Sequence, residues 1–317
     1  MYRLIRELLF RLDPEEAHEF TVEQILRLQQ IPVVLRAVAA LTSSKTEPVS
    51  LLGLSFPNRI GIAAGFDKNA VMMPFLAALG FGFIEVGTVT LYPQPGNPRP
   101  RMFRYPAHQA IINRMGFNND GADAVAERLQ AWDRRVPTLV NIGKNRDVPL
   151  EGAADAYAAC AEKLAPHADA IVVNLSSPNT PSLRELQRPE HLERILAAVG
   201  PALVKIAPDV DEVMVGEICD VCVSRARGMI CTNTTIDRPF ETSEAGGLSG
   251  GPLLAKSTNV LARVRERVGP GFPLIGVGGV FTTDDVRAKR AAGADLVQVY
   301  TGFIYEGPGL PRRLAQA

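Results

Sequence analysis

The sequence predicts an α/β protein: a (β/α)8 TIM barrel with a small helical extension at its N-terminus. Eight short apolar runs recur from about residue 59 onward, each followed by polar or glycine-rich residues and then by a helical stretch. The first 45 residues differ, because they repeat their apolar residues at helical spacing. With 46% hydrophobic and 21% charged residues, the 317-residue chain can bury a large core.

Composition narrows the classes of function. Lys and Arg together number 34, as do Asp and Glu, so no excess of positive charge indicates nucleic acid. No run has the length of a membrane span, and we expect no secretory leader. The four cysteines are typical of a reducing compartment. Cys219 and Cys222 have the spacing of a metal or redox pair, but without a second pair we expect them to pack inside a helix.

The sequence predicts helices in the N-terminal extension. Its second helix has a clear start, because Asp13 is a candidate N-cap and Pro14 fits the first helical position. Pro32 ends that helix, and residues 33–41 form a third apolar run before a linker at residues 43–48. The first helix is marked by the apolar spacing of Leu4, Ile5, Leu8 and Leu9.

We divide the chain into an extension, residues 1–45, and a barrel domain, residues 46–317. The extension is either a cap packed on the barrel or a helical pair that lies on a membrane surface and admits a lipid-soluble partner. Periodicity alone favours the cap, since few basic residues are present to attract anionic lipid.

Eight strands are expected in the barrel domain. A doubly wound sheet is the alternative, but it needs fewer strands, and no G-x-G-x-x-G follows the first run. The expected strands are residues 60–63, 83–86, 138–142, 170–175, 203–206, 229–232, 274–277 and 296–300.

The loops that follow these strands meet at one face of a barrel, where active sites form. After the fourth strand, residues 174–180 read Asn-Leu-Ser-Ser-Pro-Asn-Thr, which offers carboxamides and hydroxyls without charge. Such groups suit a flat, hydrogen-bonding ligand. Stretches rich in small residues at 246–251, 276–279 and 300–302 expose backbone N–H groups. Glycine more often marks a tight turn, but three such stretches that meet at one site favour phosphate binding there.

Two lysines stand out. Lys205 lies inside the fifth apolar strand, so it either faces a ligand such as an electron-rich ring or forms an ion pair, for which Asp209 is the nearby candidate. Lys68 directly follows the first strand, which favours the pocket over an ordinary surface position.

No histidine falls in these loops, so a Ser–His–Asp hydrolase and a multi-histidine metal site are not expected. A base must then come from Ser177, Lys68 or Lys205. Serine is a weak base, and from the residues alone Ser177 is more often a simple hydrogen-bonding group than a catalytic one.

Five motifs are distinctive when taken together. They are residues 64–68 (Ala-Gly-Phe-Asp-Lys), 113–117 (Asn-Arg-Met-Gly-Phe), 174–180, 232–235 (Thr-Asn-Thr-Thr) and 247–250 (Gly-Leu-Ser-Gly). In this combination the chain resembles one family, the dihydroorotate dehydrogenases, and the similarity runs in order through the whole chain. The extension, and a serine instead of a cysteine at position 177, resemble the class 2 branch, which is membrane-associated and reduces quinones.

The resemblance implies oxidation of (S)-dihydroorotate to orotate, with a quinone as acceptor and one FMN per chain, in the de novo synthesis of UMP. No metal is implied. The implied FMN contacts are Ala64, Gly65, Thr88, Asn141, Asn174, Lys205, Thr232, Gly250, Gly279, Tyr300 and Thr301. The implied substrate contacts are Lys68, Asn113, Arg114, Met115, Gly116, Phe117, Asn174, Asn179, Asn233 and Thr234.

The resemblance also implies roles in the reaction. Ser177 removes the C5 proton of dihydroorotate while hydride leaves C6 for the flavin, and Thr180 and Phe117 resemble a proton-exit path. The polar residues of the quinone tunnel are implied to be His18, Arg104 and Tyr300.

Periodicity alone favours a cap for residues 1–45. The resemblance reverses this preference and favours a membrane-surface role for them. We expect a monomeric peripheral protein on the cytoplasmic face of the cell membrane, without a nucleic-acid partner.

Three features depart from the family pattern or need explanation. Thr301 replaces an expected Ser, Phe66 replaces a smaller aliphatic residue, and residues 92–106 are read as a shaped loop near the quinone entrance or as a solvated basic loop. The alternative functions are a soluble FMN-dependent dihydroorotate or dihydropyrimidine dehydrogenase with another acceptor, and a non-redox phosphate-binding barrel.

Overall fold

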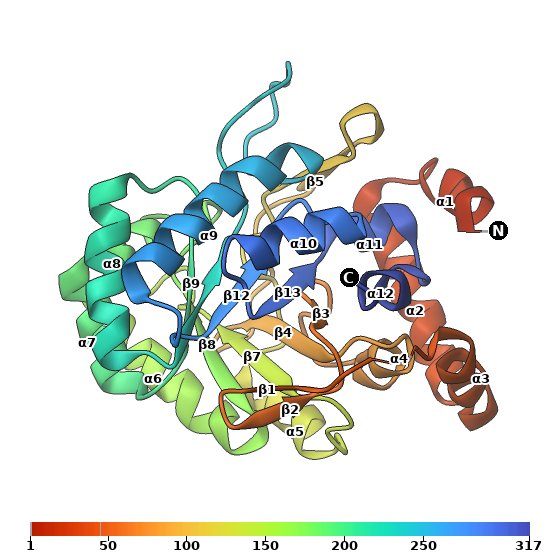
Figure 1. The fold of residues 1–317 in the computed structure, drawn as a ribbon, viewed down its shortest axis with the longest axis horizontal. Helices are drawn as coiled ribbons and strands as arrows, with labels where there is room; N and C mark the ends of the chain where they lie inside the picture. The colour runs from red at the N-terminus through yellow and green to blue at the C-terminus, as the bar shows by residue number, and fades with distance from the viewer. Residues whose placement is uncertain (1, 45) are drawn as a thin grey trace.

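The computed structural model describes residues 2–44 and 46–317, and it confirms the predicted barrel (Figure 1). All eight expected runs form parallel strands, and they follow one another around the barrel in chain order until the last pairs with the first. The strands are β3 (Ile60–Ile62), β4 (Phe83–Val89), β7 (Thr138–Ile142), β8 (Ala170–Asn174), β9 (Leu203–Ile206), β10 (Gly228–Cys231), β12 (Leu274–Val277) and β13 (Leu296–Val299).

Helices surround the barrel, so its strands are buried on both faces, as their continuous apolar sequences predict. The longer helices are α4 (Met73–Ala78), α5 (Ala122–Gln130), α6 (Ala153–Leu164), α7 (Pro189–Val199), α8 (Glu212–Arg225), α9 (Leu254–Val268), α10 (Thr283–Ala291), α11 (Thr301–Glu306) and α12 (Leu310–Leu314). Single 3-10 turns lie at Pro106–His108, Ala165–His167, Leu183–Gln187 and Gly251–Leu253. Cys219 and Cys222 are buried in α8 as free thiols, which confirms the packing interpretation.

Two small sheets lie outside the barrel. An antiparallel hairpin, β1 (Val49–Leu51) with β2 (Leu54–Phe56), precedes it, and Phe56 packs edge-on against Phe83 with ring centroids 5.5 Å apart. A three-stranded antiparallel sheet joins β5 (Met102–Tyr105), β6 (Ala110–Asn113) and β11 (Gly247–Gly250). The interpretation of residues 92–106 as a loop was therefore wrong at its end, because residues 102–105 pair with β6.

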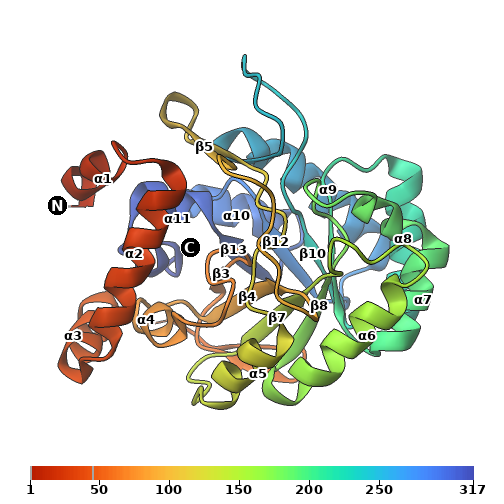
Figure 2. The same ribbon diagram turned by 180° about the vertical axis from the view of Figure 1, so that it is seen from behind.

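The extension contains three helices, which lie on the side of the barrel opposite α6, α7 and α8 in both views (Figures 1 and 2). They are α1 (Tyr2–Leu9), α2 (Pro14–Gln29) and α3 (Pro32–Thr42). The Asp13 carboxylate accepts hydrogen bonds from the backbone N–H groups of Glu15 and Glu16 at 2.8 and 3.3 Å, so the predicted N-cap is confirmed. Pro32 also begins α3, and Lys45, where the expected boundary falls, lies outside the described residues.

A buried ion pair attaches α2 to the barrel domain. Glu15 and Arg101 are both nearly inaccessible, and their closest atoms are 2.7 Å apart. The Arg101 guanidinium also donates to the carbonyls of Pro95 and Asn97, at 2.6 and 2.8 Å. The segment before β5 is thus shaped around the helical extension.

The other helices of the extension expose much apolar surface. Among the described residues, neither α1 nor α3 contains a fully buried side chain. None of the described helices is long and apolar enough to cross a membrane alone, and α2 with α3 meets that criterion only as a pair bent by 107°. Most of the exposed large apolar residues belong to the extension: Leu4, Ile5, Leu8, Leu12, Phe20, Leu28, Ile31, Val33 and Leu41.

Candidate active site

A deep pocket of about 1050 Å³, including the part that opens to solvent, lies at the carboxyl ends of the barrel strands. Every barrel strand except β7 contributes lining residues, either from its last positions or from the loop that follows it. The sheet formed by β5, β6 and β11 closes one side through Asn113 and Ser249. This is the face where barrel enzymes place their chemistry.

The structure brings together all but one of the expected cofactor contacts. Asn141, the exception, does not line the pocket but lies behind it, where its Oδ1 accepts hydrogen bonds from Thr88 Oγ1 at 2.5 Å and Asn174 Nδ2 at 3.1 Å. Asn141 therefore orients two residues that do reach the pocket. The expected contacts that line it are Ala64, Gly65, Thr88, Asn174, Lys205, Thr232, Gly250, Gly279, Tyr300 and Thr301.

The expected substrate contacts also line this pocket, again with one exception. The Arg114 side chain turns away, to an ion pair with Glu244 at 2.6 Å and to the face of the Phe103 ring, 4.4 Å from its centroid. The expected substrate contacts in the lining are Lys68, Asn113, Met115, Gly116, Phe117, Asn174, Asn179, Asn233 and Thr234.

A buried carboxylate that the sequence analysis missed organises the floor of the pocket. Glu85, in the middle of β4, is fully buried and accepts hydrogen bonds from four groups. Lys205 Nζ lies 3.0 Å from it, Gln298 Nε2 2.8 Å, Asn141 Nδ2 2.6 Å and the Ala64 backbone N–H 3.2 Å. A charged residue inside an apolar strand is the same signal that singled out Lys205, and it was available in the sequence.

The expected partner of Lys205 was therefore wrong. Asp209 does not reach it and forms ion pairs with Arg184 and Lys256 instead. Lys205 both pairs with a carboxylate and lines the pocket, so the two interpretations of this lysine are not exclusive. The ammonium is held by the Glu85 carboxylate, which three further groups fix in place, so it provides a positive charge that needs no reorganisation when a ligand binds.

The donors and acceptors of the pocket fit a flavin. Gln298 Oε1 is buried and accepts no hydrogen bond from the described residues, so this pocket residue has a free acceptor for a ring N–H. Gly278 and Gly279 have φ of +108° and +80°, and a Cβ at Gly279 would lie 2.4 Å from the Leu254 Cα. The glycines thus let this turn pack closely against the start of α9. Because both glycines also line the pocket, they present backbone to it, as a phosphate group requires.

Ser177 lies on the pocket wall with little exposed surface. Its Oγ accepts a hydrogen bond from the Asn179 backbone N–H at 3.2 Å. The neighbouring Ser176 hydroxyl instead donates to Asn174 Oδ1 at 2.8 Å and accepts from Asn233 Nδ2 at 2.9 Å. Of these two hydroxyls, the Ser177 Oγ thus faces the pocket, and the Ser176 Oγ serves the framework.

Lys68 lines this pocket and also a second one, of about 760 Å³, between α2 and the loop after β3. Burial lowers the pKa of Lys68 to about 8; Glu15 opposes this shift, whereas Arg101 adds to it. Among the described residues, Lys68 and Met115 are the two that line both cavities.

The expected tunnel residues fall in three places. His18 lines the second pocket, where burial, with a smaller contribution from Lys68, lowers its pKa to about 3, so the imidazole is neutral at physiological pH. Tyr300 lines the first pocket. The Phe66 ring packs edge-on against both, with centroid distances of 5.7 and 5.9 Å. Arg104 reaches neither cavity and lies over the Phe10 ring of the extension.

Comparison with known proteins identifies relatives over the whole chain. The family model for dihydroorotate dehydrogenase matches residues 48–317. A dihydroorotate dehydrogenase (quinone) from Acidovorax sp. (strain JS42) is 46% identical and covers 100% of this chain and 97% of its own. The corresponding Myxococcus xanthus protein is 49% identical, covering 98% and 90%. The solved structure of the Eimeria tenella enzyme in complex with ferulenol superimposes with a TM-score of 0.87 at 35% identity, covering 98% and 93%.

We predict that Glu85→Gln destabilises the protein strongly. The substitution leaves the Lys205 ammonium buried without a carboxylate, which costs about 3–5 kcal/mol of unfolding free energy. Urea denaturation measures the loss. Glu23→Gln, which breaks the exposed pair with Arg27, is the matched control and should cost at most about 0.5 kcal/mol. Equal losses in the two variants would contradict the central role of Glu85.

Proposed function

The chain belongs to the dihydroorotate dehydrogenase family, and from that membership we propose that it oxidises (S)-dihydroorotate to orotate and reduces a quinone. It is an oxidoreductase, and its place is in the de novo synthesis of UMP. The observation that carries the proposal is the Ser177 hydroxyl on the wall of a pocket that is also lined by uncharged carboxamides and by Lys205. The family is flavin-dependent, and we propose FMN as the flavin of this chain.

The pocket residues divide between the cofactor and the substrate. We assign the FMN phosphate to the backbone at Gly250, Gly279 and Thr301, and its ring to the floor formed by Thr88 and Lys205. Asn141 acts from behind by orienting Thr88 and Asn174. When bound, the flavin would accept hydride from the substrate and would pass the electrons on to the quinone.

Dihydroorotate is held by carboxamides, which match the donors and acceptors of its ring. Asn113 ends strand β6, whereas Asn179 and Asn233 lie on the loops after β8 and β10. All three line the same space, and Asn179 Nδ2 donates to Asn113 Oδ1 at 3.3 Å. Lys68 provides the positive charge that faces the substrate carboxylate. Arg114 contributes to this site through the fold of its loop, since its side chain points to Glu244.

Ser177 removes the proton from C5 of dihydroorotate. The hydroxyl is a weak base, so the surrounding hydrogen bonds and the nearby cations must stabilise the enolate that develops next to the carbonyl. Thr180 is buried, and its Oγ1 has no hydrogen-bond partner among the described residues. We assign it, with Phe117, to the exit path of the proton.

The quinone approaches from the extension. The neutral imidazole of His18, the ring of Phe66 and Tyr300 form an uninterrupted aromatic path between the two pockets. Apolar side chains exposed on α1 and α3 favour contact with lipid. Residues 1–45 then act as the membrane-association and quinone-entry segment, and residues 46–317 as the catalytic domain of a monomer on the cytoplasmic face of the membrane. Arg104 serves this segment by binding the Leu9 carbonyl at 3.3 Å.

The direct test is anaerobic reduction of the flavin by dihydroorotate. Ser177→Ala should retain flavin but slow its bleaching by about 10²–10⁴-fold, because no neighbouring group replaces the base. Ser182→Ala, an exposed serine on the same loop, is the control and should bleach at the wild-type rate. Fast bleaching in Ser177→Ala would show that Ser177 is not the base, and no bleaching of the wild type would refute the proposed function.

Lys68 makes ligand binding depend on pH. Its pKa of about 8 lies below the ordinary value for lysine, so the ammonium loses its proton as pH rises through 8. The dissociation constant of orotate from the oxidised enzyme should be constant between about pH 6 and 7 and should approach a tenfold rise per pH unit above about 8. Flavin absorbance titrations measure it. Lys68→Arg keeps its charge and should flatten the profile; a flat wild-type profile would contradict the assignment.

Membrane binding depends on the exposed apolar residues of α1 and α3. Replacing Leu4, Leu8, Val33 and Leu41 with Gln should weaken sedimentation with phosphatidylcholine vesicles at least about tenfold, without changing flavin reduction by dihydroorotate. Val213→Gln with Val223→Gln removes exposed apolar surface from α8, on the opposite side, as a control. Equal effects of both sets would exclude the extension as the membrane-binding surface.

A further inference from the structure

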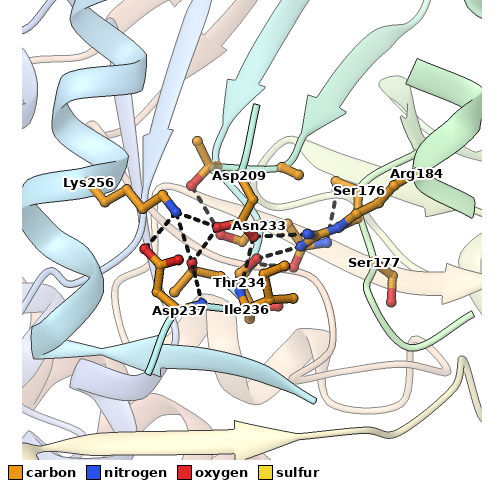
Figure 3. A network of polar contacts seen from close by, with 12 residues as sticks. Ser176, Ser177, Arg184, Asp209, Asn233, Thr234, Ile236, Asp237 and Lys256 are labelled. Atoms are coloured by element: carbon orange, nitrogen blue, oxygen red, sulfur yellow. Dashed lines mark hydrogen bonds and ion pairs between the residues drawn. The ribbon is translucent and has the colours of Figure 1, made fainter. Parts of the chain in front are cut away.

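Arg184 joins three loops of the active site (Figure 3). Its Nε donates to the Ser176 carbonyl at 3.0 Å, on the loop after β8. One terminal nitrogen donates to Asp209 Oδ2 at 2.9 Å, after β9, and the other to the Thr234 carbonyl at 3.0 Å, after β10. The three donor directions of one planar group thus fix the relative positions of three separate loops.

Asp209 holds this guanidinium in place. Its carboxylate is nearly buried and also accepts from Thr235 Oγ1 at 2.5 Å, from Lys256 Nζ at 2.5 Å and from the Ile236 backbone N–H at 3.0 Å. Burial raises the pKa of Asp209, but hydrogen bonds from Lys256 and Thr235 outweigh it and hold that pKa below the ordinary value. The carboxylate is therefore ionised and anchored from several elements at once.

Neither Arg184 nor Asp209 lines either pocket. They act through their neighbours: the Ser176 carbonyl belongs to the peptide unit that leads into Ser177, and Thr234 is a substrate-loop residue. A second connection reinforces the first, since Asn233 Nδ2 donates to Ser176 Oγ at 2.9 Å. The loop with the base and the loop that holds the substrate are thus connected at two points.

We propose that Arg184, anchored by Asp209, is the positioning residue for proton abstraction, which sets Ser177 against the substrate held by Asn233 and Thr234. The inference rests on the proposed function. A weak base tolerates little misplacement, because a displacement of about 1 Å costs on the order of 10²-fold in rate. Lysine substitutes only in part, since an ammonium keeps the charge but does not supply three coplanar donor directions.

Arg184→Met tests the proposal on the two half-reactions separately. Stopped-flow reduction of the bound flavin by saturating dihydroorotate should slow by about 10- to 100-fold. Reoxidation of the reduced flavin by a soluble quinone should be unchanged, as should flavin content, because Arg184 reaches neither the second pocket nor the cofactor residues. The flavin-reduction rate of Arg184→Lys should lie between those of the wild type and Arg184→Met. If Arg184→Met does not fold, Arg184→Lys takes its place in the test.

Arg265→Met is the matched control. Arg265 also binds a carboxylate, Asp295, at 2.9 Å, and carbonyls of Gly293 and Phe272, at 2.7 and 2.8 Å. These groups precede β12 and β13, so they lie at the opposite end of the barrel from the pocket. This variant should lower thermal stability and leave both half-reactions at wild-type rates, which separates loss of stability from loss of positioning.

Two further measurements test whether the guanidinium group of Arg184 is the group that positions Ser177. Guanidinium ion at millimolar concentration should restore part of the flavin-reduction rate of Arg184→Ala, and should not restore Ser177→Ala. Asp209→Asn should slow the same half-reaction. The double variant Arg184→Met with Asp209→Asn should be at most about twofold slower than Arg184→Met alone, because both substitutions disrupt the same pair of residues.

The outcomes are distinct. If dihydroorotate bleaches the wild type but Arg184→Met bleaches as fast, the positioning role is overturned and the proposed function stands. Equal slowing of both half-reactions, or slowing in Arg265→Met to the same extent, also overturns it. If the wild type is not bleached while dithionite still reduces its flavin, the proposed function fails and the inference fails with it.

Discussion

The buried carboxylate of Glu85 is the constraint on which the rest of the site depends. A carboxylate without solvent is costly unless its lone pairs are all satisfied, and here the donors come from β7, β9 and β13 and from the turn after β3. Each of those elements must therefore place a donor at the barrel axis. The arrangement fixes Lys205 with its ammonium at the pocket floor, and it uses both Gln298 Nε2 and Asn141 Nδ2 as donors. Asn141 Oδ1 is then turned to other partners, whereas Gln298 Oε1 has none among the described residues.

The orientation imposed at the axis propagates outward to the loops. Asn141 Oδ1, turned away from Glu85, accepts from Thr88 and Asn174. Asn174 in turn accepts from the Ser176 hydroxyl and its backbone N–H, at 2.8 and 3.1 Å. Ser176 precedes Ser177, and the carbonyl of Ser176 accepts a hydrogen bond from Arg184 (Figure 3). A hydrogen-bonded path thus leads from the barrel axis to Ser176, the residue directly before the assigned base, and each residue in it is buried or nearly so.

The sequence predicted the barrel well because its signals are local. Strands buried on both faces read as apolar runs, and each ends in the polar residues of the site. The antiparallel pairing of β11 with β6 was not predicted, since it joins segments more than 130 residues apart and no local pattern records such a pairing. The same limit explains the misassigned partner of Lys205: Asp209 is near in sequence, whereas Glu85 is near in space. A sequence motif identifies a loop of the site but not the direction of each side chain on it, as the Arg114 side chain shows by turning away to Glu244.

The helical extension is built into the active site and not merely attached to it. Arg101, which binds Glu15 of α2, also holds the Asn97 carbonyl, and the Asn97 side chain donates to the carbonyls of Arg114 and Asn179 at 2.9 and 3.1 Å. Removing the whole extension would leave Arg101 buried without its carboxylate and would disturb the loop that carries Ser177. A truncated protein would therefore confuse loss of quinone entry with damage to the substrate site. Substitutions confined to the exposed faces of α1 and α3 avoid this, because among the described residues neither helix buries a side chain fully.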